Sequence, residues 1–87
     1  MHRLTITFYG EVQGVGFRAK ARNQALELKV TGTVQNCSDG SVQAVVEGDL
    51  SAIFTLIEGL ALSFSLKDIK IAFEPSLKGL QDFLIIR

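Results

Sequence analysis

The segment from Phe8 to Arg18 holds the residues of this chain that are best suited to chemistry. It reads FYGEVQGVGFR: a strand-like run gives way to Gly10, Gly14 and Gly16, and the arginine then heads a helical pattern. Glycines let backbone N–H groups come close to a ligand, and the N-terminus of a helix favours an anion. The segment therefore predicts a loop that binds an anion.

Basic residues gather just after this loop. Arg18, Lys20 and Arg22 lie in the expected first turns of a helix, and no acidic residue occurs between Glu11 and Glu27. Cations at a helix N-terminus oppose the helix dipole, so a bound anion would relieve the conflict. The alternative interpretation is an ordinary solvated helix face. Over the whole chain nine basic residues balance nine acidic ones, which predicts neither a nucleic-acid surface nor a membrane surface.

The size and composition of the chain are those of one folded domain. It has 87 residues, 47% of them apolar, so we expect a single domain spanning residues 1–87. No apolar stretch approaches the roughly 20 residues of a membrane span, and the N-terminus lacks a signal-peptide pattern, so we expect a cytoplasmic protein. Cys37 is the only cysteine, which excludes an internal disulfide and a thiolate metal cluster built from this chain alone.

The hydrophobic pattern predicts both strands and helices. Alternating apolar residues predict strands, and apolar residues three or four apart predict helices. The expected strands cover residues 4–8, 30–36, 42–46, 68–73 and 83–86, and the expected helices cover 17–29 and the segment after Gly48, which Asp49 or Ser51 can cap. An Asp-Gly pair at 39–40 predicts a hairpin. This order predicts an α+β ferredoxin-like βαββαβ sandwich, an antiparallel four- to five-stranded sheet with two helices on one face.

Asn36 is expected to lie beside the glycine loop. In this fold the first strand, first helix and second strand form a right-handed crossover, so both strands end at the same edge of the sheet. Side chains alternate along a strand, so Asn36 shares the helix side with Val30 and Val34 if these two pack against the helices. Asn36 would then face the helix N-terminus beside Arg18.

Two motifs make the chain resemble the acylphosphatase family. GEVQGVGFR, residues 10–18, matches the family pattern GxVQGVxFR at every fixed position. The second family signature is similar to residues 32–48, with matches at Gly32, Val34, Asn36, Gly40, Val42 and Gly48. The resemblance covers nearly the whole chain, including the FLIIR ending. One residue departs from the pattern, because Thr33 occupies a position that is usually aromatic.

The resemblance implies an enzyme that hydrolyses acyl phosphates to a carboxylate and inorganic phosphate, with no metal and no other cofactor. The implied catalytic residues are Arg18, which binds phosphate, and Asn36, which positions the attacking water. The implied phosphate-binding loop consists of Gln13, Gly14, Val15, Gly16, Phe17 and Arg18. The implied partners are a small-molecule acyl phosphate and inorganic phosphate as product and inhibitor. We expect a monomer that binds no nucleic acid and no membrane.

The residue types suit these implied roles. Consecutive backbone N–H groups can form a nest around phosphate, and a guanidinium can engage two phosphoryl oxygens in parallel. An asparagine amide oxygen can accept a hydrogen bond from water, although it is too weak a base to deprotonate it. Acyl phosphates are already activated anhydrides, so positioning and charge stabilisation can supply most of the rate.

Other candidate residues and functions are less favoured. His2 begins a strand at the far edge and Cys37 is a single thiol in a hairpin, so a catalytic role is not expected for either. One alternative function is a noncatalytic phosphate-binding or regulatory module of the same fold. Another is an excised acylphosphatase-like domain of a hydrogenase maturation carbamoyltransferase, because the loop motif resembles that domain too. A nucleic-acid-binding module is disfavoured because the strands lack a basic, aromatic-rich segment.

Overall fold

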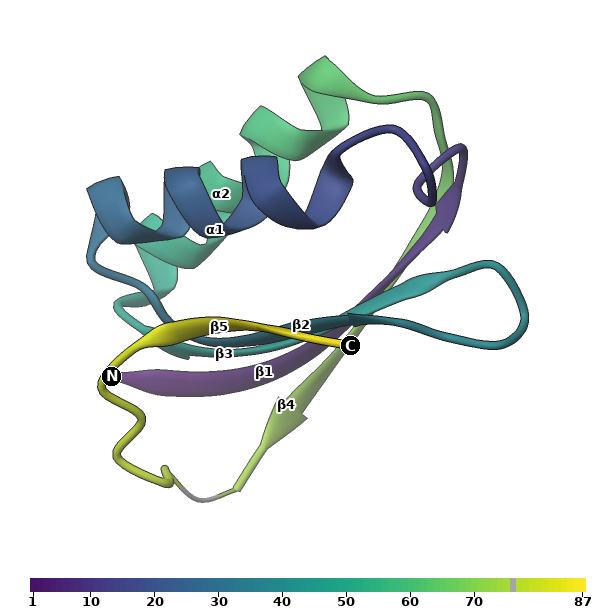
Figure 1. Cartoon of the computed structure of the whole chain (residues 1–87). Helices are drawn as coiled ribbons and strands as arrows, with labels where there is room; N and C mark the ends of the chain where they lie inside the picture. The colour runs from purple at the N-terminus through teal and green to yellow at the C-terminus, as the bar shows by residue number, and fades with distance from the viewer. Residues whose placement is uncertain (76) are drawn as a thin grey trace.

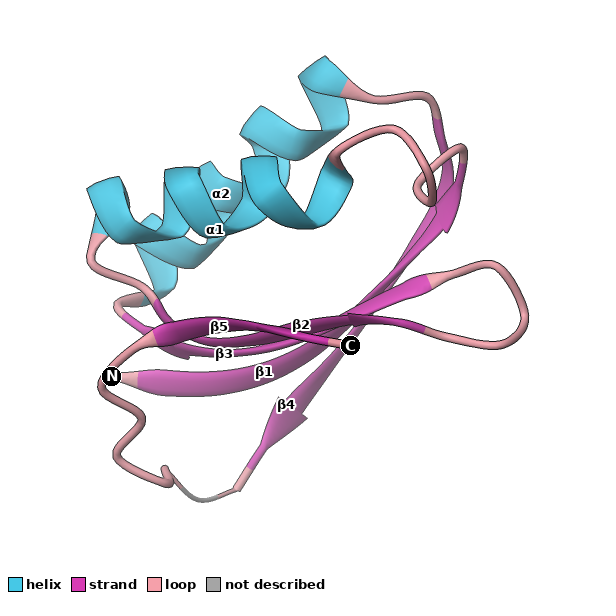
Figure 2. Cartoon of the chain, in the orientation of Figure 1, coloured by secondary structure: helices cyan, strands magenta, loops and turns pink. Residues whose placement is uncertain are grey.

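Strands and helices follow one another as expected and pack as two layers. The structure is a computed structural model that describes residues 1–75 and 77–87. The strands are β1 (His2–Gly10), β2 (Thr31–Asn36), β3 (Val42–Gly48), β4 (Leu66–Glu74) and β5 (Phe83–Ile86), and the helices are α1 (Phe17–Leu28) and α2 (Leu50–Ser63). Both helices lie on one face of the sheet (Figures 1 and 2).

The sheet has five strands in the order β4-β1-β3-β2-β5. β1 pairs antiparallel with β3 and β4, and β2 pairs antiparallel with β3. β5 instead runs parallel to β2, from Gly32 opposite Phe83 to Gln35 opposite Ile86. The predicted ferredoxin-like sandwich with two helices on one face is therefore confirmed, but the expectation of a wholly antiparallel sheet is wrong.

The parallel pairing of β5 follows from where β4 ends. The last residue of β4, Glu74, lies opposite Arg3 at the start of β1. This is also the end of the sheet at which β2 starts, because β1 and β2 are each antiparallel to β3. A strand that begins there and joins the free edge of β2 has to run in the same direction as β2.

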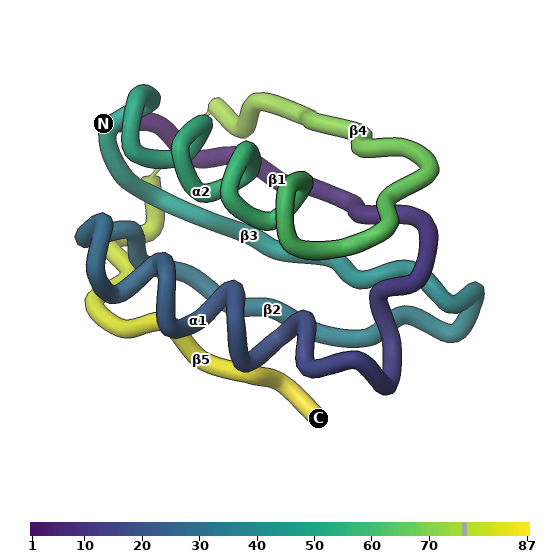
Figure 3. Tube along the Cα trace, turned by 90° about the horizontal axis from the view of Figure 1, so that it is seen from above, coloured from purple at the N-terminus to yellow at the C-terminus, as the bar shows by residue number. Residues whose placement is uncertain are grey.

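The core is built from the apolar stripe of each element, as the periodicity predicts. Its buried residues include Leu4, Ile6 and Phe8 on β1, Phe17, Ala21 and Ala25 on α1, and Ile53, Leu56, Ile57 and Leu60 on α2. β4 differs: Ile71 and Phe73 lie opposite Ile6 and Leu4 on the same side of the sheet but remain 39% and 58% exposed. Seen from above, the two helices lie over the middle of the sheet and leave β4 to one side (Figure 3).

The helix ends depart slightly from the expected ones. α1 ends at Leu28, one residue before the predicted end, and Lys29 follows with a φ of 59° in the left-handed region. Asp49 occupies the N-cap position of α2, one of the two predicted, but its side chain makes no capping hydrogen bond. Among the described residues, neither helix is long and apolar enough to cross a membrane.

Candidate functional site

The glycine loop connects the end of β1 to the start of α1. Gly14 and Gly16 have φ values of 75° and 79°, a conformation that residues with a Cβ atom rarely adopt. The first turn of α1 contains no acidic residue and no side-chain cap. The backbone N–H groups of Gly14, Val15 and Gly16 make no hydrogen bond to the residues that the structure describes. These groups are therefore available to an anion at the positive end of the helix dipole.

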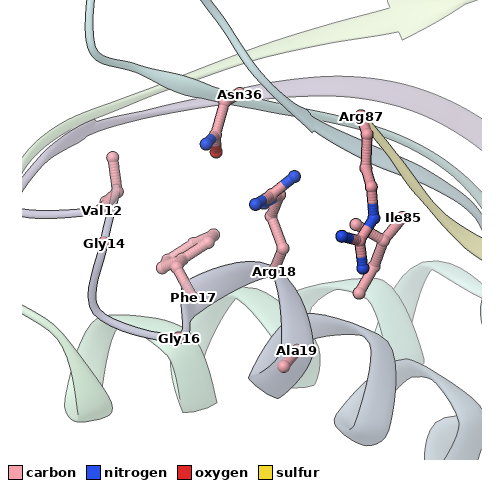
Figure 4. Close-up of a pocket in the computed structure, with 9 residues that line it drawn as sticks. All are labelled: Val12, Gly14, Gly16, Phe17, Arg18, Ala19, Asn36, Ile85 and Arg87. Carbon is pink, nitrogen blue, oxygen red and sulfur yellow. The ribbon is translucent and has the colours of Figure 1, made fainter.

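A pocket of about 210 Å³ lies over this loop (Figure 4). The loop contributes Val12, Gly14 and Gly16, α1 contributes Phe17, Arg18 and Ala19, β2 contributes Asn36, and the C-terminal segment contributes Ile85 and Arg87. Asn36 extends from the sheet toward the helix layer, and Arg18 extends from α1 toward the sheet (Figure 4). The crossover thus brings the glycine loop, Arg18 and Asn36 into one pocket.

The start of α1 is held firmly by packing. Phe17 lies with its ring centroid 4.9 Å from that of Phe8 on β1 and 4.9 Å from that of Phe64 after α2. The neighbouring Arg18 is only partly buried, and its Nη1 donates to the backbone oxygen of Ile86 at 3.4 Å. Within the described residues Arg18 forms no ion pair with a carboxylate. Its positive charge therefore remains available to an anion in the pocket.

The side chain of Gln13 ties the glycine loop to the hairpin between β2 and β3. Its Nε2 donates to the backbone oxygens of Cys37 and Ser41, each at 2.9 Å. The hairpin is also braced by Asp39, which accepts hydrogen bonds from the hydroxyl and the backbone N–H of Ser41. These bonds hold the pKa of the Asp39 carboxyl below its usual value. Gln13 therefore braces the loop against the hairpin that carries Asn36.

The predicted site residues divide into two groups. Gly14, Gly16, Phe17, Arg18 and Asn36 line the pocket, whereas Gln13 and Val15 of the predicted loop do not. The disfavoured candidates also lie outside the lining: His2 starts β1 and contacts Phe73, and the half-buried Cys37 follows Asn36. The described residues contain no group of three or more His, Cys, Asp or Glu side chains that could hold a metal ion.

Arg87 is a pocket residue that the sequence analysis missed. It follows β5 and projects into the pocket on the side opposite Asn36, next to Arg18 (Figure 4). The terminal strand itself was predicted, but its parallel pairing with β2 was not. Only that pairing carries the end of β5 to the edge of the sheet where Asn36 lies. The one feature of the sequence that could have pointed to Arg87 was the presence of a basic residue directly after a predicted strand.

Comparison with known proteins gives a consistent picture. The family model named Acylphosphatase matches residues 4–85. A curated acylphosphatase of Thermoplasma volcanium is 38% identical over 85 residues, covering 94% of this chain and 93% of the relative. One of Roseiflexus sp. (strain RS-1) is 49% identical over 57 residues, but the match spans only 66% of this chain and 61% of that relative's length.

Two solved structures resemble this one over nearly the whole length of this chain. The crystal structure of acylphosphatase from Bacillus subtilis has 33% sequence identity and a TM-score of 0.94, and it covers 100% of both chains. Full-length HypF, solved in its phosphate- and nucleotide-bound form, has 25% identity and a TM-score of 0.85. That match covers 99% of this chain but only 12% of the HypF chain, so the same fold also occurs as a small part of a longer protein.

Proposed function

The chain belongs to the acylphosphatase family, and on this basis we propose that it hydrolyses acyl phosphates to a carboxylate and inorganic phosphate. The observation that carries the proposal is the pocket, which unites the glycine loop, Arg18 and Asn36. A phosphoryl group suits this combination because several negatively charged oxygens can face several N–H donors at once.

In the proposed complex the phosphoryl group lies in the glycine loop. The backbone N–H groups of Gly14, Val15, Gly16, Phe17 and Arg18 donate to its oxygens, and the dipole of α1 favours its charge. The Arg18 guanidinium supplies the fixed positive charge and engages two oxygens in parallel. Gln13 does not contact the phosphoryl group in this proposal, because its side chain already donates two hydrogen bonds to the hairpin. It serves the loop by holding it against the hairpin.

Asn36 positions the attacking water in this proposal. Its amide oxygen accepts a hydrogen bond from a water molecule on the sheet side of the pocket. A bond forms between the water oxygen and phosphorus, and the bond from phosphorus to the carboxylate oxygen breaks. One water proton stays on the phosphate product and the other passes to solvent. The carboxylate is a good leaving group, so positioning and charge stabilisation lower the barrier without a strong base.

The first prediction concerns the division of labour between Arg18 and Asn36. With benzoyl phosphate, Arg18→Ala should raise KM and the inhibition constant of inorganic phosphate roughly 10- to 100-fold, because charge-assisted hydrogen bonds are lost. Asn36→Ala should mainly lower kcat, by about 10²-fold, since a group that acts in the transition state is lost. Steady-state phosphate release with phosphate as competitive inhibitor measures both effects.

Arg22→Ala is the matched control for this experiment. It removes an exposed cation from the same helix, but Arg22 does not line the pocket. Its kinetics should stay close to those of the wild type. An Arg18→Ala variant with the KM of the wild type would refute the assignment of phosphate binding to Arg18.

Two alternatives remain distinct from this proposal. A noncatalytic phosphate-binding module would bind inorganic phosphate but release no phosphate from benzoyl phosphate. The second alternative is a role as one domain of a longer protein, and the observation in its support is the likeness to HypF, of which the match covers 12%. Retention of both Arg18 and Asn36 in one pocket favours the enzyme.

We extend the proposal to the whole described chain. Residues 1–87 are proposed to act as one domain, because one continuous core joins the sheet to both helices. We also propose that this domain is a monomer in the cytoplasm. Inorganic phosphate is proposed as product and inhibitor, since it carries the group that the loop binds. Light scattering at assay concentration tests the monomer.

A further inference from the structure

Glu47 is a buried carboxylate outside the pocket. It lies on β3 with 3% of its surface exposed, and it alternates with Val46, so it faces away from the helices. Its Oε2 accepts hydrogen bonds from Arg3 Nη1 at 2.7 Å and from the backbone N–H of Lys78 at 2.6 Å. Its Oε1 accepts from the N–H groups of Gly79 and Leu80, at 3.0 and 3.1 Å. One side chain therefore holds three consecutive backbone N–H groups.

The segment that Glu47 holds leads directly into β5. The backbone oxygen of Asp82 accepts a hydrogen bond from the N–H of Gly32 at 2.8 Å, and Phe83 is buried with 2% of its surface exposed. β5 then runs alongside β2 (Figure 1). It runs from the end of the sheet where Thr31 lies opposite Glu47 to the end where Asn36 lies opposite Val42. At that end Ile85 and Arg87 line the pocket, and the Ile86 oxygen accepts from Arg18.

β5 is a short strand at the edge of the sheet, so an anchor near its start would help to fix its position. It spans Phe83–Ile86 and pairs on one side only, with β2. Edge strands of this length have few hydrogen bonds with which to define their position. The contacts of Glu47 set the point from which the strand starts, and four strand residues later the chain reaches the phosphate site.

We propose that Glu47 is a positioning residue of the phosphate site, which it serves by anchoring β5 and thereby placing Ile85, the Ile86 carbonyl and Arg87. The proposal rests on the proposed function for its kinetic readout. A purely structural role would change the free energy of unfolding but not the ligand affinity of the folded protein. A positioning role weakens phosphate binding in protein that is fully folded, because a small displacement of binding groups lowers affinity.

The test compares Glu47→Ala and Glu47→Gln with Ile53→Val at a temperature where all three are folded. Ile53→Val is the control because it weakens the core through α2, which does not line the pocket. The readouts are the dissociation constant of inorganic phosphate, KM and kcat with benzoyl phosphate, and hydrogen exchange of the β5 amides.

Glu47→Ala should raise the phosphate dissociation constant and KM about three- to tenfold, equivalent to the loss of roughly one hydrogen bond, with a smaller change in kcat. The β5 amides should exchange faster in this variant than in Ile53→Val. Glu47→Gln keeps one carbonyl acceptor, so its values should fall between those of the wild type and Glu47→Ala.

Two outcomes distinguish a failure of the proposed role of Glu47 from a failure of the proposed enzyme activity. If the Glu47 variants bind phosphate and substrate as the wild type does, the positioning role is overturned, even if they are less stable; Glu47→Gln decides this if Glu47→Ala does not fold. If the wild type hydrolyses no benzoyl phosphate, the proposed enzyme fails. In that case the phosphate dissociation constants still decide the role of Glu47.

Discussion

Gln13 and Glu47 serve the pocket without lining it. Gln13 lies within the glycine loop, yet its side chain donates to Cys37 and Ser41 of the hairpin. Glu47 lies toward the other end of the sheet and holds the backbone that precedes β5. A side chain that binds several backbone groups fixes one segment relative to another. Both residues therefore act on the site through the positions of other residues.

The Glu47 carboxylate makes the stability of the protein depend on pH. Burial pulls its pKa upward, but the hydrogen bonds from Lys78, Arg3, Leu80 and Gly79 outweigh burial and hold the pKa below the usual 4.5. A carboxyl with a lowered folded-state pKa stabilises the fold fully above its unfolded-state pKa. That stabilisation is lost as the pH falls through the folded-state pKa.

Urea unfolding of the wild type and Glu47→Gln tests this linkage. At pH 7 the wild type should be more stable by about 1–3 kcal/mol, because Gln leaves part of the buried hydrogen-bond set unmade. The difference should shrink as the pH falls below the usual carboxyl pKa of 4.5, because Glu47 then gains a proton more readily in the unfolded wild type than in the folded one. Asp39 titrates in both proteins, so its contribution cancels. A difference that is the same above and below that pKa would contradict the role given to the ionised carboxylate.

At the scale of the elements, both residues that flank α1 have a left-handed backbone conformation, but one is a glycine and the other a lysine. Both Gly16 before it and Lys29 after it adopt left-handed φ values, 79° and 59°. At the C-terminal end the N–H of Lys29 donates to Leu26 and the N–H of Val30 donates to Ala25, the pattern of a Schellman motif. Glycine is the usual residue at that position, and a lysine there is strained.

Lys29→Gly should therefore stabilise the protein by roughly 0.5–1 kcal/mol, because relief of the left-handed strain exceeds the added entropy of the unfolded chain. For a chain of this size the melting temperature should rise by about 2–8 °C. Lys29→Ala is the matched control, since it removes the same charge but keeps the Cβ atom. Equal melting temperatures for the two variants would show that the left-handed conformation is not the source of strain.

Across the whole molecule, the sheet is wider than the pair of helices that covers it. Phe83 at the β5 edge is buried, whereas Phe73 on β4 is 58% exposed on the helix side of the sheet. Phe83→Ala should cost about 3–5 kcal/mol of unfolding free energy, the usual loss for a buried phenylalanine. Phe73→Ala should cost less than about 1 kcal/mol.

Denaturant unfolding at low protein concentration measures both variants. Comparable losses for the two would mean that Phe73 is covered in solution, and light scattering would then show whether a second copy covers it. A small loss for Phe73→Ala together with a monomeric mass would support the monomer.

The sequence alone supported the elements, the crossover and the pairing of the glycine loop with Asn36. These features are local or follow from general rules of chain connection: apolar periodicity marks each buried face, glycines mark the loop, and crossover handedness brings Gly14 and Asn36 to one edge. The motif around Arg18 also carried the resemblance to the family that the comparisons then established. The chemistry of a motif and the local secondary structure depend on residues that are close together in the sequence, so a sequence pattern can predict them.

Only the tertiary structure decided the direction of β5, the place of Arg87 in the pocket and the contacts of Glu47. A strand pattern of four residues carries no information on which neighbour it pairs with or in which direction. That choice depends on where β4 ends, and it alone takes Arg87 to the pocket beside Arg18. Glu47 likewise looks like an ordinary strand residue until the segment before β5 folds over it. Contacts between segments far apart in the chain arise from packing, so no local sequence pattern predicts them.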